Sequence, residues 1–305
     1  RGVNRYPDRE ATELREGLAG YLGHGLTAAQ LWAANGSNEV LQQVLQAFGG
    51  PGRSLLSFTP TYSMYPLLAA GTDTEWIGVE RPEGYALDVE FVESAIRAHS
   101  PSITIICTPN NPTGTSTTAE VIAAAYDATD GILIVDEAYA EFDAENPSAI
   151  ALLPGRPRLL VSRTMSKAFA FAGVRLGYLA ADAAVVDALR LVRLPYHLSA
   201  LTQAAAITAV RHAGPMLATV GAIREQRDRL AVALLELGYR VHDSGANFLL
   251  VGGFADPAAT FTALRERGIL IRDLAIEGHL RMTAGTEAET TALIAALTEL
   301  APNDR

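Results

Sequence analysis

The sequence predicts an α/β protein, because short apolar runs typical of strands alternate with stretches of helical spacing through most of its 305 residues. These runs are apolar throughout instead of alternating with polar residues, which indicates a parallel or mixed sheet covered by helices on both faces. After about residue 199 longer helices dominate, which predicts a second, smaller α+β domain. Ligands are expected beyond the carboxyl ends of the strands of the first domain.

The first domain begins with a predicted helix at residues 40–48, VLQQVLQAF, directly after the motif NGSNE. Helices are also expected at 87–99 and 117–129, and the second of these has a Thr at its N-cap. Six strands are predicted in this domain, at residues 54–58, 74–79, 102–108, 131–139, 158–164 and 176–181.

The second part of the chain begins with long helices, predicted at 199–212 and 215–237. The following segments are strand-like runs at 240–244, 247–253, 270–273 and 280–284, and helices at 257–267 and 287–300. The sequence therefore predicts a large domain of residues 24–214 and a small domain of residues 215–305, joined by the N-terminal segment 1–23, with the boundary inside the long helix.

The composition excludes several classes of protein. A formal net charge of −10 argues against non-specific binding to nucleic acid or to anionic membranes, which needs clustered cations. Cys107 is the single cysteine, which rules out an intramolecular disulfide and any CxxC motif. No apolar run reaches the length of a membrane span, and the charged start RGVNRYPDRE is unlike a signal peptide. A cytoplasmic enzyme or binding protein is expected, and the six scattered histidines predict no metal site.

Two polar motifs lie at the ends of predicted strands. CTPNNPTG, residues 107–114, consists of turn-forming residues and is either a simple turn or a loop that presents Asn amides to a ligand. VDEAY places Asp136, Glu137 and Tyr139 after a very apolar strand, where an isolated carboxylate is costly unless it has a partner. Each carboxylate is therefore either part of a helix cap or salt bridge, or a functional group.

A third motif, NGSNE at residues 35–39, precedes the first predicted helix. Its Gly-Ser turn is suited to direct free N–H groups at an anion bound to the helix N-terminus. Simple N-capping of the helix by Ser37 or Asn38 is the alternative.

Lys167 is the only lysine among the 24 Lys and Arg residues. Because most surface positions accept either cation, a single retained lysine suggests chemistry that arginine cannot perform. An amine forms a Schiff base with an aldehyde or ketone, whereas a guanidinium is effectively always protonated and does not. Chance survival of one lysine is the alternative explanation.

The neighbours of Lys167 complete a candidate cofactor site. Arg175 is well placed to hold a phosphate, and the hydroxyls of Thr164 and Ser166 are available to the same anion. A Schiff-base lysine beside a phosphate site suggests pyridoxal phosphate, whose ring nitrogen needs an acidic partner. Asp136 fits that role, because a buried carboxylate would keep the ring nitrogen protonated and make the ring an electron sink.

The order and approximate spacing of the motifs resemble those of the aspartate-aminotransferase-like (fold type I) pyridoxal-phosphate enzymes, and within them most closely the histidinol-phosphate aminotransferases. The motifs are NGSNE, YSMY, PNNPTG, VDEAY, RTMSKAFAFAGVRLG, ILIRD and LRMTAGT. The resemblance extends from Tyr6 to the C-terminal helix. It implies transamination between L-histidinol phosphate and 2-oxoglutarate, giving imidazole acetol phosphate and L-glutamate, in histidine biosynthesis.

At the matching positions, the resemblance implies roles toward the cofactor. Lys167 holds it as a Schiff base and moves a proton between substrate and cofactor, and Asp136 pairs with the ring nitrogen. Tyr139 and Asn111 hydrogen-bond the phenolic oxygen, and Tyr62 stacks on the ring. The implied phosphate ligands are Ser37, Asn38, Thr164, Ser166, Arg175 and, from the neighbouring subunit, Tyr6. The implied enzyme is a homodimer with shared active sites.

The resemblance also implies that Arg281 and Arg272 bind the anionic ends of substrates, with Asn111 beside them and Asn247 near the same pocket. Two arginines suit this reaction, because glutamate brings two carboxylates and histidinol phosphate brings a phosphate ester, and guanidinium groups bind both kinds of anion. An ordinary strand-edge arginine is the alternative for Arg281.

The chain departs from the family pattern in two places. It does not contain the segment of the form ENPYPP, whose Tyr lines the substrate pocket in family members, and residues 20–32 form a shorter stretch than expected. An aromatic amino acid aminotransferase is the close alternative, and a phosphoamino-acid decarboxylase of the same superfamily is a more distant one. A non-catalytic α/β binding protein is disfavoured, because neither GxGxxG after a strand nor GxxxxGK[ST] occurs.

Overall fold

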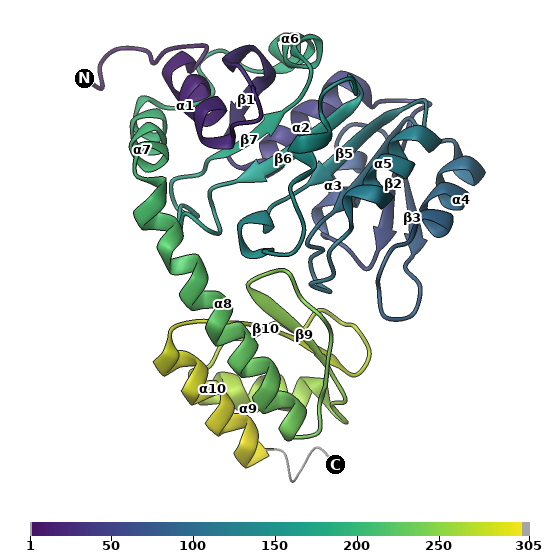
Figure 1. Ribbon diagram of the computed structural model, residues 1–305, viewed down its shortest axis with the longest axis vertical. Helices are drawn as coiled ribbons and strands as arrows, with labels where there is room; N and C mark the ends of the chain where they lie inside the picture. The colour runs from purple at the N-terminus through teal and green to yellow at the C-terminus, as the bar shows by residue number, and fades with distance from the viewer. Residues whose placement is uncertain (1, 301–305) are drawn as a thin grey trace.

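A mixed seven-stranded sheet forms the larger part of the computed structural model, which describes residues 2–300 (Figure 1). The strand order is β1-β7-β6-β5-β4-β2-β3, and β7 runs antiparallel to both of its neighbours while the other pairs are parallel. The strands are β1 (Leu31–Ala34), β2 (Ser54–Thr59), β3 (Glu75–Glu80), β4 (Ile103–Cys107), β5 (Ile132–Asp136), β6 (Leu159–Thr164) and β7 (Gly177–Ala180). The predicted mixed, mostly parallel sheet is confirmed.

Six of these strands agree with the predicted ones to within a few residues. The predicted strand at 131–139 was too long, because the chain leaves the sheet after Asp136 and turns into the 3-10 helix η2 (Ala140–Phe142). The edge strand β1 was not predicted. Its four residues are too few to show a strand-like hydrophobic pattern. They form a strand because they pair with β7, almost 150 residues further along the chain.

Helices cover both faces of this sheet, with one apolar core under each layer. On one face pack α1 (Thr12–Leu22), α4 (Val89–His99), α5 (Ala119–Ala128) and α7 (Ala200–Arg211). On the other pack α2 (Ser37–Phe48), α3 (Met64–Ala70) and α6 (Ala183–Val192). The expected Thr at the start of α5 is Thr118, whose side chain accepts a hydrogen bond from the N–H of Val121. The remaining 3-10 helices are η1 (Ala28–Gln30) and η3 (Ala149–Leu152).

The long helix α8 (Ala213–Glu236) runs from the large sheet to a three-stranded antiparallel sheet of order β10-β9-β8 (Figure 1). These strands are β8 (Arg240–Val241), β9 (Phe248–Gly252) and β10 (His279–Thr283). Together with α9 (Pro257–Glu266) and α10 (Glu287–Leu300), α8 and the small sheet enclose a third apolar core. The α+β character of this part is confirmed, and the boundary near residue 215 stays a prediction.

One strand expected in the small sheet does not form. Residues 270–273 contribute a single bridge, in which Arg272 and Arg281 exchange two backbone hydrogen bonds of 2.9 Å. Among residues 2–300, no helix is both long enough and apolar enough to cross a membrane.

Candidate active site

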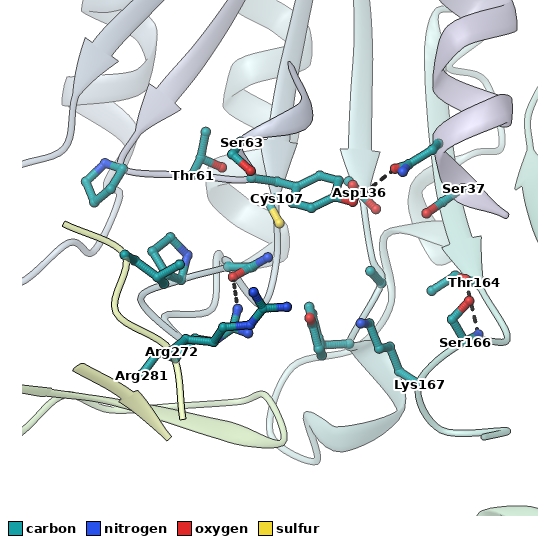
Figure 2. Close-up of a pocket in the computed structure, with 18 of the residues that line it drawn as sticks. Ser37, Thr61, Ser63, Cys107, Asp136, Thr164, Ser166, Lys167, Arg272 and Arg281 are labelled. Atoms are coloured by element: carbon teal, nitrogen blue, oxygen red, sulfur yellow. Dashed lines mark hydrogen bonds between the residues drawn. The ribbon is translucent and has the colours of Figure 1, made fainter. Parts of the chain in front are cut away.

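A cavity of about 590 Å³ opens at the carboxyl ends of the parallel strands, beside the segment that precedes β10. Every residue predicted to bind cofactor or substrate lines it, except Tyr6. The predicted residues that it brings together are Ser37, Asn38, Tyr62, Asn111, Asp136, Tyr139, Thr164, Ser166, Lys167, Arg175, Arg272 and Arg281. Figure 2 shows Asp136 and Cys107 on one side of this space, with Lys167, Arg272 and Arg281 extending into it from the other side.

Asp136 ends β5 and is 2% exposed. The hydroxyl of Tyr65 donates a 2.9 Å hydrogen bond to its Oδ2, whereas its Oδ1 is buried without a hydrogen-bond partner. Burial raises the pKa of Asp136 to about 6, although the hydrogen bonds from Tyr65 and from the backbone N–H of Ala138 lower it. A buried carboxylate oxygen that lacks a partner fits a protonated ring nitrogen of a cofactor.

Lys167 lies in the connection between β6 and β7, and its ammonium nitrogen is 5.3 Å from the centroid of the Tyr139 ring. The pKa of Lys167 is lowered, first by the loss of hydration among the walls of the cavity and then by the positive charges of Arg281, Arg272 and Arg175. The cavity therefore increases the fraction of the neutral amine, which is the nucleophilic form.

The N-terminus of α2 reaches the cavity with its first-turn N–H groups uncapped. Gly36 occupies the N-cap at φ 86°, and no side chain caps the helix there. Ser37 and Asn38 lie in the first turn, and the Asn38 Oδ1 accepts a 3.1 Å hydrogen bond from the Tyr62 hydroxyl. The N-capping alternative for these two residues is therefore wrong, and the free N–H groups are available to an anion.

Two glycines allow this helix end to approach the strand and the arginine beside it. A Cβ on Gly177 would lie 2.1 Å from the backbone nitrogen of Ser37, and a Cβ on Gly36 would lie 2.6 Å from Nη2 of Arg175. Thr164 and Ser166 adjoin the same corner, where the Ser166 N–H donates to the Thr164 hydroxyl. The groups that meet here are hydroxyls, backbone N–H groups and a guanidinium, which is the donor set of a phosphate site.

The loop at 107–114 is both a turn and a contributor to the cavity. Asn110 is fully buried and donates to the Pro60 carbonyl at 3.0 Å and to the Thr113 hydroxyl at 2.8 Å. Asn111 faces the cavity instead, and its Oδ1 accepts a hydrogen bond from Nη1 of Arg281. The NH₂ group of Asn111 is available to donate to a ligand. Asn110 therefore belongs to the turn, whereas Asn111 presents its amide to the cavity.

Arg281 is held at the cavity wall by three contacts. Its guanidinium carbon lies 4.6 Å from the centroid of the Phe248 ring, its Nη1 binds Asn111, and its backbone pairs with that of Arg272. Its Nε is buried and has no hydrogen-bond partner within residues 2–300. An arginine with a free donor beside a second arginine is suited to a dianion or to two separate anionic groups. Asn247 adjoins β10, where its carbonyl accepts the N–H of Ala284 at 2.9 Å.

Tyr6 lies outside the cavity of its own chain. It is 81% exposed, and its ring stacks on that of Tyr196 with centroids 4.6 Å apart. Its contact with the phosphate of a neighbouring subunit stays a prediction.

Tyr65, Cys107 and Phe248 adjoin Asp136 or Arg281, and none of them was assigned a role from the sequence. Tyr65 is the last residue of the motif YSMY, three positions after Tyr62, and this spacing could have indicated that the two rings are in contact. Cys107 pairs in register with Asp136 in the adjacent strand, a neighbour that sequence spacing does not reveal. Phe248 comes from the small sheet, and only the tertiary structure brings its ring to Arg281.

Glu137 does not take part in the cavity. Its carboxylate binds Arg163 with an Nε–Oε2 distance of 2.9 Å and also accepts hydrogen bonds from Ser148 and from the N–H of Ala149. The two carboxylates of VDEAY therefore separate, with Asp136 in the cavity and Glu137 in a buried ion pair. Within residues 2–300, no three His, Cys, Asp or Glu side chains are grouped so that they could hold a metal ion.

Comparison with known proteins agrees with the geometry of this cavity. Residues 1–297 match the family model for class I and II aminotransferases. The histidinol-phosphate aminotransferase of Paenarthrobacter aurescens (strain TC1) is 57% identical over 303 residues, which cover 98% of this chain and 82% of that protein. The corresponding enzyme of Thermobifida fusca (strain YX) is 55% identical over 289 residues, or 94% of this chain and 79% of that protein.

Among solved structures, the histidinol-phosphate aminotransferase from Sinorhizobium meliloti in complex with pyridoxal-5'-phosphate superposes with a TM-score of 0.89 at 25% identity. The match covers 99% of this chain and 84% of that one. Sequence similarity and fold therefore lead to the same group of enzymes. The chain belongs to the class I and II aminotransferases and, within them, to the histidinol-phosphate aminotransferase family.

Proposed function

We propose that this protein is a pyridoxal-phosphate-dependent transaminase that acts between L-histidinol phosphate and 2-oxoglutarate and gives imidazole acetol phosphate and L-glutamate in histidine biosynthesis. The observation that carries this proposal is one cavity that holds the only lysine of the chain, a buried carboxylate with an unpartnered oxygen, and two arginines. A cytoplasmic location, expected from the composition, is part of the proposal.

The residues at the cavity fit pyridoxal phosphate. The free Oδ1 of Asp136 is suited to bind the ring nitrogen, and the Asn111 amide and Tyr139 hydroxyl to bind the phenolic oxygen. The phosphate would be held by the residues around the α2 N-terminus, namely Ser37, Asn38, Thr164, Ser166 and Arg175. When bound, the cofactor supplies an electron sink for the charge that develops at the substrate Cα.

Lys167 is the proposed general base and acid. Its Nζ takes the proton from the substrate Cα and later donates a proton to the cofactor. The first transfer requires that Lys167 begins as a neutral amine. The lowered pKa of Lys167, caused by burial and by the three neighbouring arginines, supports this role. The Tyr139 ring lies beside the lysine, with its centroid 5.3 Å from Nζ.

Arg281 and Arg272 are the proposed anion-binding residues. The amino donor histidinol phosphate carries a phosphate ester and the acceptor 2-oxoglutarate carries two carboxylates, so both halves of the reaction bring anions to the cavity. The unpartnered Nε of Arg281 and the pairing of its backbone with Arg272 support a shared site for these groups.

A homodimer that completes the active site is also part of the proposal. The N-terminal segment and the start of α7 line a shared surface hollow with four exposed apolar side chains, namely Val3, Tyr6, Tyr196 and Leu201. Apolar area of this kind on one face is typical of a protein–protein contact. A second copy of the chain on this face would bring Tyr6 close to a neighbouring phosphate site.

The substrate is tested by steady-state kinetics with 2-oxoglutarate as the acceptor. We expect kcat/KM for histidinol phosphate to exceed that for phenylalanine by at least about tenfold, because a site built for a phosphate disfavours a substrate that lacks one. A preference for phenylalanine would instead favour the aromatic aminotransferase alternative. Lys167→Arg is the control, which keeps the charge but cannot form a Schiff base, and it should be inactive toward both substrates.

A further inference from the structure

The carboxylate of Asp136 is oriented by one side chain from the helix layer above it. Tyr65, at the start of α3, is 1% exposed, and its hydroxyl donates to Oδ2 of Asp136 at 2.9 Å. The neighbouring Tyr62 packs edge-on against the Tyr65 ring, with centroids 5.6 Å apart and planes at 85°. Tyr62 lines the cavity and binds Asn38, whereas Tyr65 lies behind it and reaches the carboxylate from its buried side.

The surroundings of Asp136 leave Tyr65 as its only hydrogen-bonding side chain among the described residues. Cys107 lies beside it in β4, and its thiol is directed to the Pro109 carbonyl at 3.6 Å and also interacts with the Tyr65 hydroxyl. The backbone N–H of Ala138 is a further donor, while the charges that act on Asp136 from a distance are those of Glu137 and Lys167. In the described part of the chain, Oδ1 has no hydrogen-bond partner. One oxygen is therefore anchored and the other is free.

From this arrangement we infer that Tyr65 is a positioning residue for the cofactor's ring nitrogen: its hydroxyl fixes the rotamer of Asp136 with Oδ1 available to the ring, and it keeps the shared proton on the nitrogen. A donor to one oxygen of a carboxylate stabilises the ionised form and makes the other oxygen a weaker base. The weaker base leaves the proton on the ring, where it is needed for the electron sink.

Removal of the hydroxyl reverses both effects. Without the Tyr65 donor, the buried Asp136 becomes more basic, and it competes more strongly for the proton of the ring nitrogen. The carboxylate also loses its fixed orientation. This inference rests on the proposed function, because it needs pyridoxal phosphate bound with its ring nitrogen at Asp136.

The test is Tyr65→Phe in the full chain loaded with pyridoxal phosphate that carries ¹⁵N in the ring. We expect the ¹⁵N chemical shift in the variant to move from the protonated toward the unprotonated pyridine value, and the cofactor dissociation constant to rise about tenfold. Both quantities are measured without turnover, so they report the cofactor site separately from catalysis. We also expect kcat to fall more than KM rises.

Tyr178→Phe is the matched control. Tyr178 is 1% exposed, and its hydroxyl is buried without a hydrogen-bond partner, so the same substitution there removes an unbonded oxygen. We expect its ¹⁵N shift and cofactor affinity to equal those of the wild type. The inference is overturned if Tyr65→Phe also matches the wild type in both quantities, or if the ring nitrogen is already unprotonated in the wild type. Failure of the wild type to bind pyridoxal phosphate would instead refute the proposed function.

Discussion

Asp136 and Glu137 are neighbours at the end of β5, and the two carboxylates differ in how completely they are paired. Glu137 accepts from the Ala149 N–H at 2.6 Å through Oε1, and from Ser148 and Arg163 through Oε2. Oδ2 of Asp136 accepts from Tyr65, and its Oδ1 has no hydrogen-bond partner among residues 2–300. Both side chains are buried, so burial does not distinguish them. The unused oxygen marks the carboxylate that is available to a ligand.

The paired carboxylate belongs to a cluster that supports the site from the opposite side of the sheet. Arg163 bridges Glu137 and Glu141, with an Nη1–Oε1 distance of 3.0 Å to the latter. Burial lowers the pKa of Arg163, and the two carboxylates raise it by more, so the net shift is upward. Because Glu137 and Glu141 flank Tyr139 in the chain, this cluster fixes the turn that carries a cavity residue. We therefore expect substitutions in the cluster to affect stability and those at Asp136 to affect the reaction.

The largest effect on stability is expected for Arg163→Met. The substitution leaves two buried carboxylates without their partner, and loss of one member of a buried ion pair typically costs about 3–5 kcal/mol. The free energy of unfolding, measured by urea titration, should fall by about this amount. Arg211→Met is the control, because the Arg211 side chain is 66% exposed and that of its partner Glu13 is 44% exposed, and a change of only about 0–1 kcal/mol is expected there. Equal losses in the two variants would contradict the assignment of the buried cluster.

For Asp136→Asn we expect a smaller change, in the activation free energy of the reaction and not in stability. The amide keeps the shape of the side chain but cannot balance a protonated ring nitrogen, so kcat for transamination should fall about 10²- to 10³-fold, the usual effect of removing one electrostatic partner of the transition state. Stability without cofactor should not decrease, because no ion pair is broken. The measurement is single-turnover kinetics alongside urea unfolding, and a variant that loses stability but keeps its rate would reverse the comparison.

The smallest effect is the pH dependence of stability that Asp136 contributes in the absence of cofactor. Its pKa rises from 3.8 to about 6 on folding, so between these values the folded chain binds more protons than the unfolded chain. Stability should therefore fall as pH rises from about 4 to about 6, by on the order of 3 kcal/mol, and should not change further from this source above that range.

The contribution of Asp136 is isolated by comparing how the free energy of unfolding depends on pH in the wild type and in Asp136→Asn. The free energy of unfolding is measured for both proteins at several pH values. As pH rises from about 4 to about 6, the variant is expected to become increasingly more stable than the wild type. A difference that is constant with pH would show that Asp136 ionises in the fold as it does in the unfolded chain.

Prediction from the sequence succeeded where a feature depends on a single residue type or on a local pattern. The continuous apolar runs indicated the strands of the large sheet, and the one lysine lines the cavity with the other residues predicted for it. It was less successful where an element depends on a distant partner. The edge strand β1 exists because β7 pairs with it, and residues 270–273 form one bridge instead of a strand.

The sequence alone was sufficient to identify which residue types could bind an aldehyde, a phosphate and an anionic substrate, because these functions depend on amine, hydroxyl and guanidinium groups in recognisable order. Only the tertiary structure showed that Glu137 is paired with Arg163 and brought Tyr65 and Phe248 to the site. The physical reason is that hydrogen-bond completeness and cross-strand or cross-sheet contact depend on packing between segments far apart in the chain. Local spacing records which side of a strand a residue occupies, but not what it meets there.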